Sequence, residues 1–138
     1  MVHALKEVWR VLAPGGILID FRPVGDCWPL EFETGGQRQS VAILDRAPRV
    51  RDDVTCDGVM REVVRKGWFV HEKTQSLSFV AYWNSIAELD APVTIPDEVS
   101  VKAQRLLDSS GSGSRIGITF DNTVSIYRKE AGSPHDSE

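Results

Sequence analysis

The segment RVLAPGGILIDFRPV, residues 10–24, decides how the chain begins to fold. Apolar side chains before and within it repeat every three to four residues and predict an amphipathic helix over residues 2–13. These are Leu5, Val8, Trp9 and Leu12. Pro14 cannot continue that helix, and the two glycines after it can close the helix end. The apolar run that follows lacks alternation, so we expect a strand over residues 17–21 that is covered on both faces, as in a parallel sheet.

The remaining elements follow from the same kinds of pattern. Two short apolar runs flanking Gly35 and Gly36 predict a hairpin or a flap over residues 28–44. A helix is expected over residues 54–66, and a long strand alternates from Leu77. The last elements expected are a helix from Pro96, a flexible loop at 109–114, and one strand within 115–129 or two pieces hinged at Asp121-Asn122. We expect one domain over residues 1–130 and a disordered tail at 131–138.

Composition excludes several classes of protein. The 138 residues carry a net charge of −4, which gives no basic field for nucleic acid or an anionic membrane. No apolar run approaches the roughly 20 residues of a membrane span. Cys27 and Cys56 are far apart and lack histidines at ligand spacing, so we interpret them as free thiols rather than a disulfide or a zinc site. A cytoplasmic protein is expected.

Residues 4–21, ALKEVWRVLAPGGILIDF, resemble a late helix-turn-strand segment of class I S-adenosylmethionine-dependent methyltransferases. In that family a phrase like R-V-L-x-P-G-G precedes the fifth strand of a seven-strand sheet. VVRKGWFV and LSFVAYWNSIAEL are similar to the helix, sixth strand and following turn, and VSIYRK is similar to the seventh strand. The resemblance implies an α/β fold: the C-terminal half of a Rossmann-like methyltransferase sheet, mixed parallel and antiparallel, with flanking helices.

The resemblance does not extend to the family's cofactor site. That site needs a glycine-rich turn leading from a strand into a helix, followed later by an acid that binds a ribose. The glycine pairs at 15–16 and 35–36 and the glycines at 111 and 113 do not have this setting. We therefore assign no cofactor-binding, catalytic or metal-binding residue, and S-adenosylmethionine would bind only if a complementary half were supplied.

Three residues after the first strand are candidates for substrate binding. In open α/β sheets ligands gather beyond the carboxyl ends of strands, where Arg22, Asp26 and Trp28 follow one another. Arg22 would hold an anionic group and Trp28 would form an apolar wall. The alternative is a loop with a salt bridge and one anchoring aromatic. The three histidines are assigned to surface, edge or tail positions: His3, His71 and His135.

These observations lead to two hypotheses about function. In the first, the chain is methyltransferase-like, carries the substrate side, and is inactive without a complementary N-terminal half. In the second, it is a non-catalytic homodimeric module for assembly or ligand binding. In both, the strand at 17–21 must be shielded, either by pairing with a second copy or by a rearranged fold that uses the 28–44 hairpin. Because the helix at Val2 begins without a cap or leader, we also expect that the chain was cut through a domain.

Overall fold

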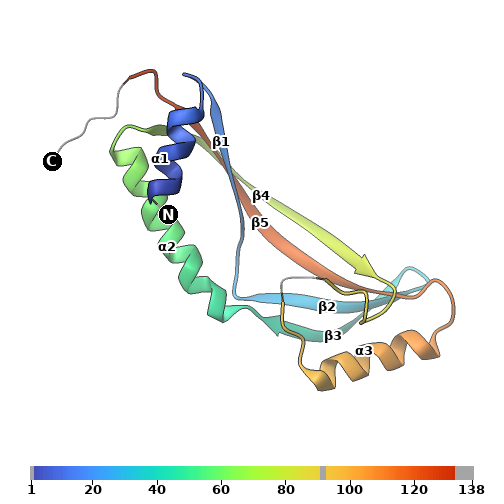
Figure 1. Cartoon of the computed structure of the whole chain (residues 1–138). Helices are drawn as coiled ribbons and strands as arrows, with labels where there is room; N and C mark the ends of the chain where they lie inside the picture. The colour runs from blue at the N-terminus through green and yellow to red at the C-terminus, as the bar shows by residue number, and fades with distance from the viewer. Residues whose placement is uncertain (1, 91–92, 133–138) are drawn as a thin grey trace. The chain divides into compact units, whose positions relative to one another are not determined.

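The computed structural model describes residues 2–90 and 93–132 (Figure 1). Along the chain, each helix is followed by one or more strands. In chain order the elements are α1 (Val2–Val11), β1 (Ile17–Pro23), β2 (Cys27–Thr34), β3 (Gln37–Asp45), α2 (Ala47–Arg65), β4 (Phe69–Trp83), α3 (Asp97–Ser109) and β5 (Arg115–Lys129). Each predicted helix and strand is present, and β5 is one continuous strand. Of the predicted tail, residues 133–138 lie outside the described part.

The chain divides into two compact units, each built from separate stretches of sequence. Unit 1 contains Met1–Val24, Pro48–Leu77 and Asn122–Glu138, and unit 2 contains Gly25–Ala47 and Ser78–Asp121. Strands β4 and β5 each contribute to both units. The prediction of one domain over residues 1–130 stays a prediction.

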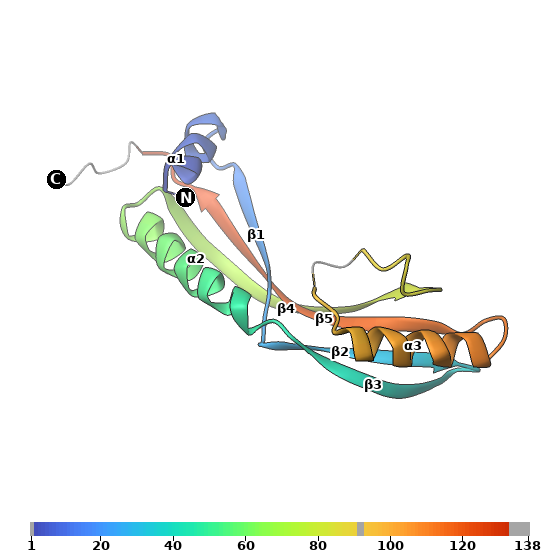
Figure 2. The ribbon, with the colours of Figure 1, turned by 60° about the horizontal axis from the view of Figure 1, so that its bottom comes forward.

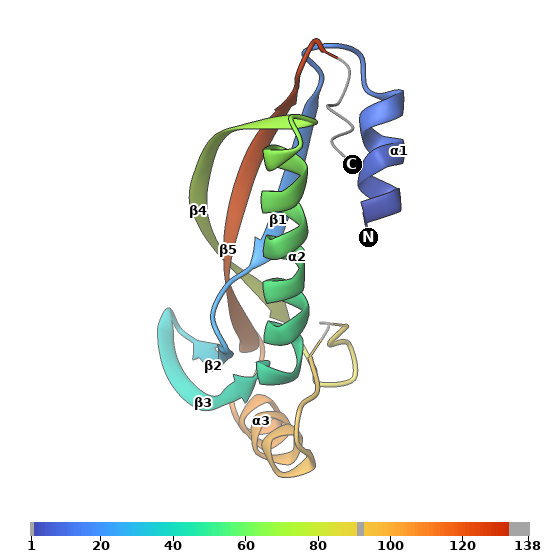
Figure 3. The ribbon, with the colours of Figure 1, turned by 90° about the vertical axis from the view of Figure 1, so that its left-hand side faces the viewer.

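Unit 1 packs both of its helices against one face of the β1–β5 pair. Leu18 and Tyr127 lie opposite each other in the antiparallel register and contribute to the same core. From α1 that core receives Leu5, Val8, Trp9 and Leu12, and from α2 it receives Met60, Val63 and Val64. Figure 3 shows α2 running alongside β1. The stripe that predicts the first helix is therefore its packing face.

A glycine-closed turn sets the direction in which the chain leaves α2. Gly67 adopts a positive φ of 73°, and its N–H donates to the carbonyl of Val64 at 3.0 Å. The N–H of Trp68 donates to the carbonyl of Val63, also at 3.0 Å. This pair of bonds is a Schellman motif, which satisfies helix carbonyls that would otherwise lack donors. It also brings Trp68 and the first residue of β4, Phe69, into the core of unit 1.

Unit 2 is a hairpin with α3 packed against it. Gly35 and Gly36 both have positive φ, as a two-residue hairpin turn requires, and β2 pairs with β3 on either side of them. In Figure 2, α3 lies against β2 and β3. Ala103 and Leu107 of α3 are buried in that core. Its other fully buried members are Leu30, Leu44, Ile116 and Ile118.

The sheet corrects the expected fold class. All five strands pair antiparallel, so the predicted half of a Rossmann-like sheet, mixed parallel and antiparallel, is wrong. The decisive contact is at the Pro-Gly-Gly turn, where the Gly15 N–H donates to the Lys129 carbonyl and the Lys129 N–H donates to the Gly16 carbonyl. The last strand thus closes directly onto the start of β1 and runs antiparallel to it.

The expected covering of β1 on both faces is also corrected. Its burial alternates, with Ile17, Ile19 and Phe21 exposed and the residues between them half-buried. One face of β1 thus carries apolar side chains that the described residues leave uncovered. This outer face is the more apolar of the two, because the half-buried positions that alternate with it hold Leu18, Asp20 and Arg22.

Candidate functional site

A cavity of about 370 Å³, which we call the α2 cavity, opens in unit 1 between α2 and the strands. Its lining residues are Arg22 from β1, Asp57, Met60, Arg61 and Val64 from α2, His71 from β4, and Tyr127 from β5. The α2 residues follow one another at spacings of three, one and three, which places them on one face of the helix. The cavity therefore combines apolar side chains with several groups able to form hydrogen bonds.

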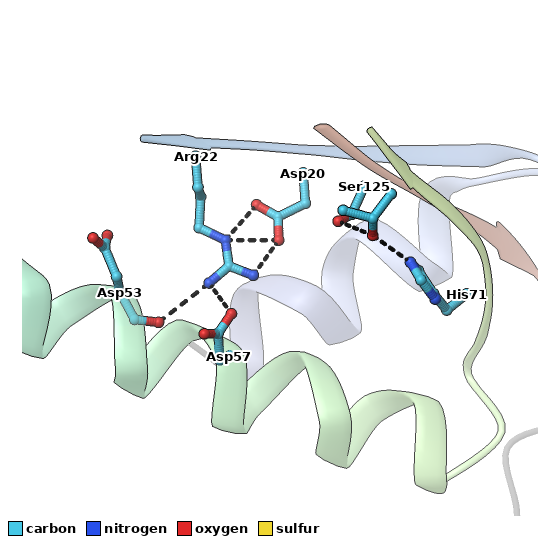
Figure 4. Close-up of polar contacts among 7 residues, drawn as sticks. Asp20, Arg22, Asp53, Asp57, His71 and Ser125 are labelled. Carbon is cyan, nitrogen blue, oxygen red and sulfur yellow. Dashed lines mark hydrogen bonds and ion pairs between the residues drawn. The ribbon is translucent and has the colours of Figure 1, made fainter. Parts of the chain in front are cut away.

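Arg22 ties β1 to α2 at one end of this cavity (Figure 4). Its Nε lies 2.9 Å from Oδ2 of Asp20, and its Nη2 lies 2.6 Å from the same oxygen. Its Nη1 lies 2.6 Å from Oδ1 of Asp57 and donates to the backbone carbonyl of Asp53 at 3.2 Å. Burial opposes the charge on Arg22, but the hydrogen bond and charge of Asp20 outweigh it, so the pKa of Arg22 is raised. The guanidinium is thus fixed and its charge compensated.

His71 is linked to β5 by a short hydrogen-bonded chain. Its Nε2 lies 2.8 Å from Oγ1 of Thr74, which in turn lies 2.8 Å from Oγ of Ser125. The His71 ring also packs against the Tyr127 ring, with centroids 5.1 Å apart. A nucleophilic serine needs a base in direct contact. Because Thr74 stands between His71 and the buried Ser125, this geometry orients the imidazole rather than activating the serine.

Tyr127 contributes a protonated hydroxyl to the site. Burial raises the pKa of Tyr127 above its ordinary value, and the charge of Asp20 raises it further. Its hydroxyl therefore remains a potential donor throughout the neutral range.

Arg61 is the cation of the cavity that remains available. Within residues 2–90 and 93–132, no carboxylate forms an ion pair with it, whereas Arg65, one turn later, is held by Glu62. Arg61 is exposed and lies on the cavity wall.

The three residues predicted to bind substrate do not all belong to the same unit. Arg22 belongs to unit 1, while Asp26 and Trp28 belong to unit 2. Asp26 is exposed, and its carbonyl accepts from the Arg46 N–H. Trp28 is 3% exposed and meets the Phe120 ring edge-on at 4.8 Å, so it anchors the core of its unit. These contacts match the alternative of a salt bridge and an anchoring aromatic, and a role of the three in substrate binding stays a prediction.

Sequence reasoning missed the α2 side of the cavity. The helix expected over residues 54–66 carries an apolar stripe that includes Met60 and Val64, and the sequence analysis assigned no site residue to the polar positions beside it. Asp57 precedes Val64 by seven residues and Arg61 precedes it by three, so helical spacing places both beside the stripe. His71 is exposed on β4, in agreement with its predicted edge or surface position.

A second polar cluster in unit 2 is closed rather than open to a ligand. Glu33 accepts from Arg115 at 2.7 Å and from Tyr82 at 3.1 Å, and it pairs with Arg38 at 3.2 Å. The Arg115 hydrogen bond, reinforced by the other two groups, lowers the pKa of Glu33. The Arg115 guanidinium lies 3.6 Å from the Tyr82 ring centroid. Only about 10 Å³ is left at this cluster, which is too little for a ligand.

The glycine turns do not fit the cofactor that the resemblance implies. Each positive-φ glycine in the described residues lies in a turn or loop that leads into a strand. They are Gly15 before β1, Gly25 before β2, Gly35 and Gly36 before β3, Gly67 before β4, and Gly111 and Gly113 before β5. A phosphate or nucleoside cradle of the dinucleotide type instead leads from a strand into a helix N-terminus.

Within the described part of the chain, no group of three or more His, Cys, Asp or Glu side chains is arranged to hold a metal ion. The described helices include none with the length and apolar character needed to cross a bilayer.

Comparison with protein-family models, with curated proteins and with solved structures gave no match.

Proposed function

We propose that this chain is a methyltransferase-like ligand-binding module that supplies the acceptor side of a methyl transfer and requires a partner to bring S-adenosylmethionine. The resemblance of residues 4–21 supports the methyltransferase relationship, and the α2 cavity supports the ligand-binding role. Alone, the module would bind an acceptor without transferring a methyl group to it.

The observation that carries the proposal is the uncovered state of β1. This strand pairs with β5 on one side and stands at the end of the sheet order β1-β5-β2-β3. Ile19 in its centre is 62% exposed, between the exposed Ile17 and Phe21. An edge strand with apolar side chains is a template for pairing with another chain. A partner on this edge would lie next to the strand that carries Arg22.

Complementation tests this proposal. The chain is co-expressed with the N-terminal half of a class I methyltransferase, cut before its own R-V-L-x-P-G-G helix, and the purified mixture is titrated calorimetrically with S-adenosylmethionine and S-adenosylhomocysteine. We expect a complex that binds the cofactor although this chain alone gives no heat. Micromolar binding by the isolated chain would contradict the assignment of the cofactor to a partner.

The exposed β1 side chains also favour a second candidate, a non-catalytic homodimer in which another copy covers the same edge. Ile19→Lys would place a charge at the centre of that contact and convert a dimer to a monomer. Val101→Lys on α3 is the matched control, because Val101 is also an exposed apolar residue. Mass in solution decides this candidate: a monomeric native chain, or equal loss of the dimer in both variants, excludes it.

A further inference from the structure

We propose that the α2 cavity binds a small molecule that carries an oxyanion, either a carboxylate or a phosphate, on an apolar body, with Arg61 as its principal cation. This inference rests on the proposed function in that the ligand would be the methyl acceptor, and it names the chemical class of that acceptor.

Of the two arginines that line the cavity, Arg22 is already paired within the described residues and Arg61 is not. Arg22 is compensated by Asp20 and Asp57, so its donors are already engaged. Arg61 has no ion pair with any described residue, and its guanidinium presents donors in the planar arrangement that matches carboxylate and phosphate oxygens. Arg61, which lines the cavity, is therefore free to pair with an anionic ligand.

Donors from two other elements converge on the same space. Tyr127 of β5 lines the cavity, and a tyrosine hydroxyl is protonated at neutral pH. His71 of β4 uses Nε2 toward Thr74, which leaves Nδ1 for a ligand. A ligand oxyanion beside Arg61 would thus meet groups from α2, β4 and β5.

The remaining walls set the size and character of the ligand. Met60 and Val64 provide an apolar surface on α2, and the Tyr127 ring adds to it. A volume of about 370 Å³ is near the lower end of the roughly 300–1,000 Å³ typical of small-molecule sites. The cavity is therefore suited to a single small ring or a short branched chain bearing the anionic group.

The test uses the full chain, labelled with ¹⁵N, and simple probes without S-adenosylmethionine. Benzoate and phenyl phosphate are titrated separately, with neutral benzamide as the probe matched in shape. We expect either anion to shift the backbone amide signals of residues 57–64, 71 and 127, and benzamide to leave them in place. The anion that binds more tightly identifies the acceptor as a carboxylate or a phosphate.

Two variants connect the binding to Arg61. Arg61→Gln should weaken binding of the anion by about tenfold, as expected for one charged hydrogen-bonding group. Arg65→Gln removes the same charge one turn along α2, where Glu62 already engages it, and should change binding less than twofold. Both residues are exposed, so the native dispersion of the amide spectrum should persist.

Three results would overturn the inference: no shift with either anion, equal shifts with benzamide, or equal loss of affinity in the two variants. Anion binding combined with failed complementation would retain this inference and reject the proposed function. Successful complementation without anion binding would retain the proposed function and reject this inference.

Discussion

Replacing Arg22 by Met should destabilise the protein more than replacing its exposed partner Asp57 by Asn. The guanidinium is 18% exposed and Asp20 is 17% exposed, and two nitrogens of Arg22 contact that carboxylate. Met fills much of the same volume, so packing changes little while Asp20 loses its cation. The link from β1 to Asp57 and to the Asp53 carbonyl is lost as well.

The magnitude follows from the burial of each partner. Removing one member of a fully buried ion pair costs about 3–5 kcal/mol, and a hydrogen bond to a charged group contributes about 1.5–3 kcal/mol. Because Arg22 and Asp20 retain some contact with water, we expect Arg22→Met to lower the free energy of unfolding by about 2–3 kcal/mol. Asp57 is 58% exposed, so Asp57→Asn should lower it by only about 0.5 kcal/mol.

Urea unfolding of the single and double variants measures both effects, followed by tryptophan fluorescence and by far-ultraviolet circular dichroism. The double variant should be little less stable than Arg22→Met alone, because the contact with Asp57 is already absent. Equal losses of stability in the two single variants would refute the reasoning. The contact with Asp57 would then account for the whole effect of Arg22→Met, and the contact with Asp20 for none of it. A loss below about 0.5 kcal/mol for Arg22→Met would refute it too.

Three further predictions concern packing, helix propensity and pH. Gly117→Ala would bring a Cβ to 2.9 Å from the Tyr82 ring, so we expect a loss of about 1–3 kcal/mol in urea unfolding, and unchanged stability would contradict the close approach. Gly58→Ala, in α2 with no atom within 4 Å of the new Cβ, should instead stabilise by about 0.5–1 kcal/mol in the same assay. Because the pKa of Tyr127 is raised by burial, the unfolded chain ionises this tyrosine first, and folding stability is lost as pH rises above about 10. Tyr127→Phe should lose less stability than the native chain between about pH 9 and about pH 11, and parallel losses would argue against the raised pKa.

Local patterns in the sequence predicted the elements but not their pairing. The apolar stripe before Pro14 and the glycines at 35–36 are patterns of a few neighbouring residues. The first predicts α1 and the second predicts the β2–β3 hairpin, and both elements form there. Strand β1 differs because its partner β5 is about a hundred residues away, and no local pattern specifies that register. The exposed residues of β1 are all apolar, whereas the half-buried ones include Asp20 and Arg22, so hydrophobicity alone could not show which face of the strand is covered.

The candidate site shows the same limit. Arg22 was identified from its place after a strand, and it does line the cavity. Its partner Asp57 lies on a helix separated from it by the whole hairpin, and only the tertiary fold joins them. Trp28 was grouped with Arg22 through proximity in sequence, but β2 turns its side chain into a different core.

The sharing of β4 and β5 between the two units affects how the gene can be divided. The polypeptide passes between units at 24/25, 47/48, 77/78 and 121/122, so no single cut releases either one intact. Both termini belong to unit 1, so a truncation from either end first removes part of unit 1, and unit 2 could be excised only as two fragments. Duplication or recombination of this gene would therefore have to transfer both units together, and deletion mapping by successive truncation should disrupt unit 1 before unit 2.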